Sequence, residues 1–168
     1  MYFNPSFGEQ FGNDQMEMDR MGMDQMRMRQ SPFSDMNLIR DVSNAVILEV
    51  QAYNFYQRLS ELVNNEQDRQ IILRIQGDEA RHYHWFTMIL RRLGGQHPQV
   101  PTIEVPIDLE QGLRLAIESE LEAVSYYQDI ALRASDHMIQ MHFLHAASDE
   151  QRHASWFEYI LMNLLSTN

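Results

Sequence analysis

From residue 35 onward, hydrophobic residues recur along the chain at steps of three and four, which is the spacing of one face of an α-helix. The clearest stripe passes through Ile72, Ile75, Phe86 and Ile89. Breaks in the pattern divide this region into four helical segments. They cover about residues 35–64, 66–93, 108–134 and 135–165. Four amphipathic helices of this length predict an all-α protein, an antiparallel four-helix bundle.

The connections between these segments differ in length, and the difference predicts the topology. Asn64–Asn65 separates the first two helices, and Gly94–Gly95 is the expected end of the second. Residues 94–107 contain three prolines, so this segment is predicted to be an extended crossover rather than a helix. Two short hairpins joined by one long crossover are therefore expected, not a simple up-and-down bundle.

Acidic residues and histidines interrupt the hydrophobic stripe near the middle of each helix. Two of the helices carry Glu-x-x-His, a spacing that projects both side chains from one helical face. The six residues are Glu49, Glu79, His82, Glu120, Glu150 and His153. An ionised carboxylate inside a bundle costs several kcal/mol even after relaxation, so four together need compensating positive charge. Two divalent cations would supply it, and the pattern therefore predicts a site for two metal ions.

The same residues reveal an internal duplication. Glu49 and His82 recur 71 positions later as Glu120 and His153, and the other members of the pattern keep this register. They include the pairs Tyr56/Tyr127, Glu79/Glu150 and Trp85/Trp156. Residues 36–94 and 108–165 are thus predicted to be two copies of one helical hairpin. A duplicated ligand set favours two nearly equivalent metal ions.

On these motifs the chain resembles the rubrerythrin and ferritin-like di-iron family. The matching positions are Glu49 with Tyr56, the run Asp78-Glu-Ala-Arg-His82, Glu120 with Tyr127, and the run Asp149-Glu-Gln-Arg-His153. The resemblance covers residues 36 to the C-terminus and implies the ferritin-like fold. It also implies that Glu79 and Glu150 bridge two iron ions, that Glu49 and Glu120 are terminal ligands, and that each histidine binds one ion.

The resemblance further implies a shell of residues around the ligands. Asp78 would orient His153, and Asp149 would orient His82, each by accepting a hydrogen bond from the imidazole; the alternative is a pair of solvated surface aspartates. For Tyr56 and Tyr127, which lie two turns beyond Glu49 and Glu120, two interpretations stay open. Their hydroxyls would hydrogen-bond to ligand carboxylates near the chemistry, or the rings would simply pack in the core.

Two departures from related proteins narrow the type of centre that is expected. Rubrerythrins usually carry an additional glutamate where this chain has Ile117, so the site is closer to the four-glutamate, two-histidine centre of bacterioferritin. The methionine that binds haem in bacterioferritin is replaced by Ala80, so no haem is expected.

Composition limits the partners, the types of metal site and the cellular location that are expected for this protein. The net charge of −11 disfavours binding to nucleic acid or to an anionic membrane. The chain has no cysteine, which excludes disulfides, thiolate metal sites and a rubredoxin-type centre within it. It has no apolar run of about eighteen residues and no signal-peptide pattern at its start, so a cytoplasmic location is expected. A spore or a protein compartment is the alternative.

The first 34 residues differ from the rest of the chain. Three tandem units at residues 14–28 place paired methionines after each aspartate, and the segment is predicted to be a disordered, low-complexity tail. The thioethers could bind a soft ion such as Cu(I) or consume oxidants, although nothing nearby completes a copper site. The alternatives are a flexible tail without a site and a segment that docks on a partner.

Oxygen and imidazole ligands favour iron, with manganese as the alternative. The sequence therefore predicts a di-iron oxidoreductase that reacts with O₂ or H₂O₂, either as a peroxidase with an external electron donor or as a ferroxidase that oxidises Fe(II). A di-manganese catalase and a non-catalytic iron-storage or spore-associated protein are the other interpretations. A homodimer or a higher homo-oligomer is expected.

Overall fold

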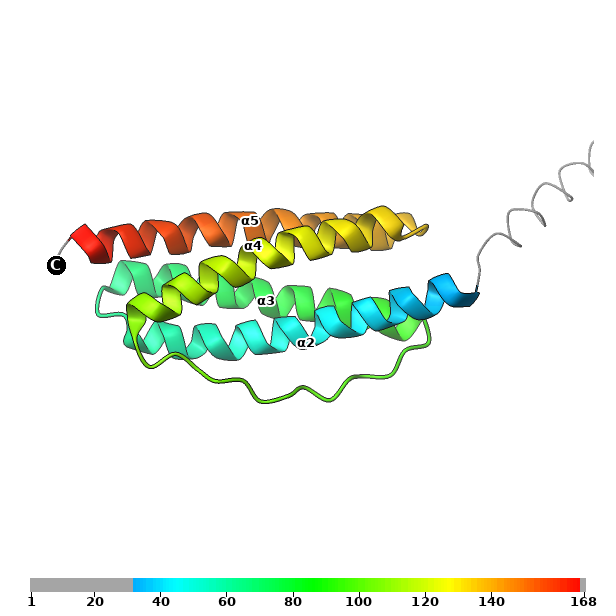
Figure 1. The fold of residues 1–168 in the computed structure, drawn as a ribbon, viewed down its shortest axis with the longest axis horizontal. Coiled ribbons are helices and arrows are strands. Elements are labelled where there is room, and N and C mark those ends of the chain that lie inside the picture. Colours follow the sequence, from blue (N-terminus) through cyan, green and yellow to red (C-terminus); the bar gives the residue numbers. More distant parts are fainter. Residues whose placement is uncertain (1–31, 167–168) are drawn as a thin grey trace, which may run out of the picture. The chain divides into compact units, whose positions relative to one another are not determined.

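The computed structural model describes residues 32–166, and within this range all regular structure is helical. Figure 1 shows the four helices running alongside one another. They are α2 (Pro32–Leu62), α3 (Glu66–Arg92), α4 (Leu109–Arg133) and α5 (His137–Ser166). This arrangement confirms the all-α four-helix bundle. The predicted tail lies outside the described residues up to residue 31, whereas residues 32–34, which the sequence assigned to it, are helical.

The helix ends follow from local hydrogen bonds that the sequence signals. Asn65 caps α3 by accepting a hydrogen bond from the backbone N–H of Gln67 at 2.8 Å. Asp108 caps α4 in the same way through Gln111 N–H at 2.9 Å. At the end of α3, Gly94 adopts a φ of 81°, a conformation that glycine reaches without strain.

The hydrophobic core of residues 38–166 is divided into two clusters. One cluster contains Val46, Phe86, Tyr127 and Phe143, and the other contains residues such as Ile72 and Phe157. In every helix the two clusters lie on opposite sides of the acidic and histidine positions along the chain. Their order reverses between α2 and α3 and again between α4 and α5, as antiparallel hairpins require. The charged layer is therefore enclosed by apolar packing along the bundle.

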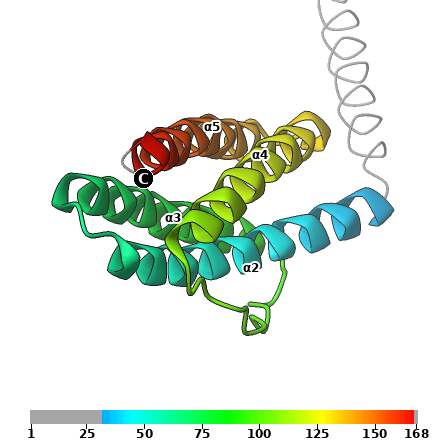
Figure 2. The same ribbon diagram turned by 60° about the vertical axis from the view of Figure 1, so that its left-hand side comes forward.

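The crossover between α3 and α4 runs along α2, as Figures 1 and 2 show from two sides. Gln51 of α2 donates a side-chain hydrogen bond to the carbonyl of Pro101 at 3.2 Å, which holds the crossover against the helix. Tyr83 and His97 make a second contact, with the phenol oxygen 3.0 Å from Nε2. The predicted extended crossover is thus confirmed.

Two aromatic residues are more exposed than their helical spacing from the ligands suggests. Tyr53, four residues after Glu49, is 41% exposed, because it lies about 40° around the helix from Glu49 and so falls at the edge of the buried face. Trp156 is 42% exposed and contacts Tyr159, whereas Trp85, its counterpart in the first hairpin, packs against the ring of His142 at 5.1 Å. The surroundings of the two tryptophans therefore differ between the two copies of the repeat.

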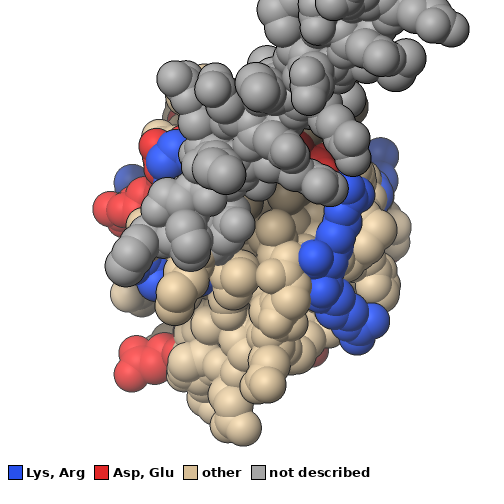
Figure 3. Space-filling model, turned by 90° about the vertical axis from the view of Figure 1, so that its right-hand side faces the viewer, with Lys and Arg blue, Asp and Glu red and all other residues tan. Residues whose placement is uncertain are grey.

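All thirteen basic residues of the chain are arginines. Figure 3 shows a band of them beside a largely uncharged surface.

Among the described helices, none combines the length and the apolar content that a membrane span requires.

Candidate metal centre

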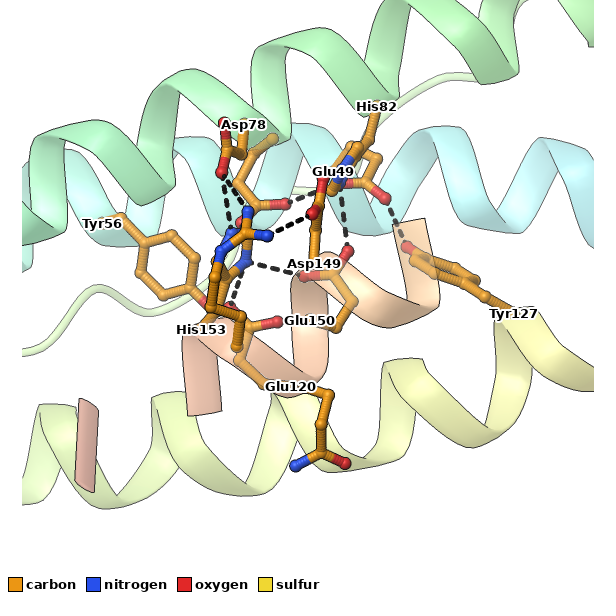
Figure 4. Close-up of polar contacts among 12 residues, drawn as sticks. Glu49, Tyr56, Asp78, His82, Glu120, Tyr127, Asp149, Glu150 and His153 are labelled. Atoms are coloured by element: carbon orange, nitrogen blue, oxygen red, sulfur yellow. Dashed lines mark hydrogen bonds and ion pairs between the residues drawn. The ribbon is translucent and has the colours of Figure 1, made fainter. Parts of the chain in front are cut away.

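All six predicted ligands converge at the middle of the bundle. Glu49 comes from α2, Glu120 from α4, and the two Glu-x-x-His pairs from α3 and α5. None of the six is more than 3% exposed. Figure 4 shows five of them gathered around a common centre: Glu49, His82, Glu120, Glu150 and His153. The burial removes the simplest alternative, which is that the acids are solvated surface residues.

The donor atoms form two overlapping groups. In each group, one ligand atom from every residue lies within 4.8 Å of the others. Glu49, Glu79, His82 and Glu150 make the first group, and Glu79, Glu120, Glu150 and His153 make the second. Glu79 and Glu150 belong to both. This is the arrangement expected when two carboxylates bridge two ions and two others bind one ion each.

The spacing of the donors suits metal coordination. Nδ1 of His82 lies 3.1 Å from Glu150 Oε1 and 3.5 Å from Glu79 Oε2. Nδ1 of His153 lies 3.1 Å from Glu79 Oε1 and 2.9 Å from Glu150 Oε2. Metal–ligand bonds of about 2.1 Å place neighbouring octahedral ligands about 3.0 Å apart. Both histidines therefore stand at ligand-to-ligand distances from both shared glutamates.

Several of these buried atoms lack a hydrogen-bond partner. Within the described residues, Glu79 Oε1, Glu150 Oε1 and His82 Nδ1 are buried and unpaired. Leaving such groups unsatisfied costs about 1–3 kcal/mol each, and more when they are charged. Unpaired carboxylate and imidazole donors that face one another fit a pair of divalent cations.

Protons offset part of the carboxylate charge when no cation is bound. Burial raises the pKa of Glu49 and of Glu120 well above the ordinary glutamate value. Burial alone would lower the pKa of His82 and His153, but their contacts with aspartates and glutamates raise it instead. Burial would likewise raise the pKa of Glu150, yet its close contacts with the imidazoles of His153 and His82 hold that pKa below its usual range. The site has a strong demand for positive charge.

Asp78 and Asp149 lie where the sequence paired them. Nε2 of His153 is 3.1 Å from Asp78 Oδ2, and Nε2 of His82 is 3.1 Å from Asp149 Oδ2. The contact with His153 lowers the pKa of Asp78 to about 2, so this carboxylate is an acceptor at neutral pH. An imidazole that donates from Nε2 to a carboxylate has Nδ1 left for a metal ion.

Arg81 and Arg152 complete this outer layer, and the sequence reasoning missed them. Arg81 contacts Asp78 at 2.7 Å and Asp149 at 2.9 Å, while Arg152 contacts Asp149 at 2.7 Å and Asp78 at 3.0 Å. The two arginines and two aspartates thus form a closed ring between α3 and α5. A signal was present, because both arginines obey the 71-residue repeat.

The two tyrosines lie close to the ligands. Tyr56 donates a hydrogen bond to Glu120 Oε1 at 2.6 Å, and Tyr127 donates one to Glu49 Oε1 at 2.5 Å. Each bond joins one hairpin to the other. Burial, and then the nearby carboxylates, raise the pKa of both phenols well above the ordinary value, so both remain protonated donors. Both rings are also part of the core, so the two interpretations of these residues are compatible.

A cavity of about 700 Å³ reaches the centre from the side of α2 and α4. All four ligand glutamates line it, together with Tyr56 and Tyr127. Sequence reasoning did not predict this cavity. Neither His142 nor His145 is among its described lining residues. Ile117 packs against an apolar cluster, so no extra carboxylate enters the site at that position.

Comparisons with known proteins show what this chain is similar to in sequence. Residues 111–167 match the family model described as Rubrerythrin. The chain is also 36% identical over 129 residues to the uncharacterized protein YhjR of Bacillus subtilis (strain 168), an alignment that covers 76% of this chain and 89% of that protein.

Two solved structures share the fold. The hypothetical protein Pfu-1136390-001 from Pyrococcus furiosus superimposes with a TM-score of 0.69 at 17% identity, covering 78% of this chain and 92% of that one. A dodecameric thioferritin, the bacterioferritin-related protein from Bacteroides fragilis, gives 0.68 at 19% identity, with 79% and 89% covered. At these identities the likeness concerns the fold, which is ferritin-like. The family match and the curated relative, together with this fold, show that the chain belongs to the rubrerythrin family.

Proposed function

We propose that this protein binds two iron ions through the six buried ligands and acts as an oxidoreductase toward H₂O₂ or O₂. The observation that carries the proposal is the pair of four-residue groups that share Glu79 and Glu150. Carboxylate and imidazole donors favour iron or manganese over thiophilic metals, and membership of the rubrerythrin family favours iron. Two iron ions held by shared carboxylates can supply two electrons together, which is what the reduction of peroxide to water requires.

The protein's own residues would prepare the site for this chemistry. The ring of Asp78, Arg81, Asp149 and Arg152 fixes both imidazoles with Nδ1 directed inward. The phenols of Tyr56 and Tyr127 hold the outer ligands Glu120 and Glu49 by hydrogen bonds. The two apolar clusters exclude water on either side of the charged layer. Apolar packing on these two sides strengthens the electrostatic interactions among the ligands.

Anaerobic loading with Fe(II) tests this proposal. Elemental analysis should give two iron ions per chain, and H₂O₂ or O₂ should then produce near-ultraviolet ferric absorption. The double variant Glu79→Ala/Glu150→Ala should lose both ions, because each shared carboxylate belongs to both donor groups. Wild-type protein that binds no iron, or that shows no ferric absorption with either oxidant, would refute the di-iron oxidoreductase.

The source of electrons distinguishes a ferroxidase from a peroxidase. A ferroxidase consumes further Fe(II) over repeated additions in the presence of oxidant. A peroxidase instead stops after one oxidation of the bound pair unless an external donor is supplied. Manganese in protein purified without added metal, together with O₂ release from H₂O₂, would identify a di-manganese catalase instead.

We also infer that the chain forms a homo-oligomer. The bacterioferritin-related neighbour is described as dodecameric. In this chain, α5 exposes large hydrophobic side chains, and a rotation of about 100° per residue places most of them on one face. Those on this face are Met141, Leu144, Trp156, Tyr159 and Met162, whereas Leu165 lies beside it. Such a face on a helix supports burial against a second copy.

A further inference from the structure

The cavity beside the metal centre is larger than the chemistry proposed so far requires. Its volume is about 700 Å³. A water molecule in the liquid occupies only about 30 Å³, and an iron ion, O₂ or H₂O₂ needs no more than a few times that space. Sites for organic ligands typically measure about 300–1,000 Å³. The cavity therefore has the size of a site for an organic molecule.

Three elements of the chain build the walls of this cavity, and most of the wall residues are apolar. Ile47, Ala52 and Phe55 belong to α2, Leu115 belongs to α4, and Ile103 comes from the crossover. The hydrogen bond between Gln51 and Pro101 holds the crossover against α2 beside the cavity. Apolar walls favour a ligand with an apolar body.

The charged residues of the cavity restrict the ligand further. Among the described lining residues there is no arginine or histidine, while six are glutamates. Four of these are the ligand glutamates at the floor, and the other two, Glu104 and Glu122, are exposed. Bound cations would neutralise the floor but would leave Glu104 and Glu122 charged. An anion would thus meet like charge and no cationic partner, while a cation would lose its hydration among the apolar walls, beside a floor that the metal ions already neutralise.

We propose that this cavity binds an uncharged organic molecule with an apolar body and holds it against the metal centre. The inference rests on the proposed function, because the floor of the cavity is the proposed ligand set. It adds a substrate class that reduction of O₂ or H₂O₂ alone does not require. The organic molecule would approach the metal-binding glutamates from the side of α2 and α4. This side is opposite the ring formed by Asp78, Arg81, Asp149 and Arg152 on α3 and α5.

A pair of fluorescent probes tests the proposal on the full-length, iron-loaded protein. N-phenyl-1-naphthylamine is uncharged, and 1-anilinonaphthalene-8-sulfonate has the same ring skeleton with an added sulfonate. The uncharged probe should bind with one site per chain, and the sulfonate should bind at least tenfold more weakly. Failure of the uncharged probe to bind, or equal binding of the two probes, would overturn the proposal.

Variants then locate the probe. Ala52→Phe/Ala123→Phe adds two rings to the lining and should weaken binding of the uncharged probe at least tenfold. Leu132→Phe adds a ring to α4 at a position that is 82% exposed and outside the lining, and it should change nothing. Should the double variant fail to fold, Leu115→Gln places an amide on a wall residue that is already 44% exposed, and it should weaken binding severalfold. Unchanged affinity in the folded lining variants would contradict the proposal.

Two further measurements separate the occupants and the hypotheses. Deletion of residues 1–31 should leave probe affinity unchanged; binding that appears only after the deletion would mean that this segment fills the cavity. Binding that appears only on dilution to monomers would mean that a second copy covers it, and either result overturns the proposal. Iron content is measured in every sample, because two bound iron ions without probe binding would reject only the organic ligand, whereas absence of iron would reject the proposed function.

Discussion

Asp78 and Asp149 each contact two arginines and one imidazole, and this sharing fixes the orientation of both histidine ligands. Because each arginine bridges both aspartates, neither aspartate can rotate without breaking contacts to both arginines. The planar guanidinium presents several donors in a fixed geometry, which a lysine ammonium cannot reproduce. We therefore expect Arg81 and Arg152 to act as positioning residues for His82 and His153.

Replacing both arginines tests this role. Arg81→Gln/Arg152→Gln should weaken iron binding by up to about tenfold, because the arginines hold the aspartates that orient the histidines, and losing such an orienting partner itself costs about ten- to hundredfold. Affinity is measured by competition with a chromophoric chelator. Arg114→Gln is the matched control, since Arg114 pairs with Glu110 on the surface of α4 away from the site. An unchanged affinity in the double variant would show that the aspartates hold the imidazoles without the arginines.

The tyrosine hydroxyls should contribute to stability as well as to the site. Tyr56→Phe or Tyr127→Phe leaves a buried glutamate oxygen without its donor, so each should lower the free energy of unfolding by about 1–3 kcal/mol. Urea unfolding followed by tryptophan fluorescence measures the loss. Tyr83→Phe removes an exposed contact with His97 and should cost no more than about 0.5 kcal/mol. Equal losses at Tyr83 and Tyr56 would contradict this account.

At the scale of single residues, the sequence was sufficient where spacing along one helix decided the outcome. The pairs Glu79/His82 and Glu150/His153 share a helical face at any packing angle, and the duplication then located their partners. Arg81 and Arg152 could not be placed in this way, because their contacts depend on how α3 and α5 lie against each other. The cavity is even harder to predict from the sequence, because its volume depends on the separation of α2 and α4 and on the path of the crossover.

At the scale of helices, two glycines with the same local conformation have opposite surroundings. Gly77 lies in α3, where an added Cβ would meet no atom within 4 Å. Gly112 lies in the first turns of α4, where an added Cβ would come within 2.7 Å of Leu59 and 2.9 Å of the Pro106 ring. Leu59 is fully buried and the Pro106 ring is rigid, so neither can move away freely. The close approach of the crossover therefore requires glycine at residue 112 and not at residue 77.

Alanine substitutions should separate these two positions. Gly77→Ala should stabilise the protein by about 0.5–1 kcal/mol, because alanine is the better helix former and meets no clash. Gly112→Ala should destabilise it by about 1–3 kcal/mol through overpacking against Pro106. Thermal unfolding of the two variants under identical metal loading measures both. Stabilisation by Gly112→Ala would show that the crossover yields at little cost.

Helix ends were predictable to within three residues, because Asn65, Asp108 and Gly94 are local signals that act through neighbouring backbone groups. Tyr53 shows where this reasoning fails. Its spacing from Glu49 is helical, yet whether a residue 40° from the centre of the buried face is covered depends on the neighbouring helix. Periodicity specifies the middle of a face better than its edges.

At the scale of the whole molecule, the exposed hydrophobic face of α5 should determine self-association. Trp156→Glu/Met162→Glu places two charges on this face and should shift the protein to smaller species in light scattering, with iron content unchanged. Leu132→Glu puts a charge on an 82% exposed leucine of α4 and should leave the mass as in the wild type. A monomeric wild-type protein, or a double variant with the wild-type mass, would reject the interface.

Metal loading should also stabilise the whole bundle, because the ligands come from all four helices. A ligand that binds only the folded state adds about 2.7 kcal/mol per site when its free concentration is a hundredfold above Kd. For a protein of this size, each kcal/mol raises Tm by about 2–4 °C, so two occupied sites should raise Tm by about 10–20 °C over chelator-treated protein. Glu79→Ala/Glu150→Ala should show no such rise, since it removes the carboxylates common to both donor groups. If the wild type bound two ions without a change in Tm, the ions would not be holding the four helices together, and the ligands would have to be sought outside this layer.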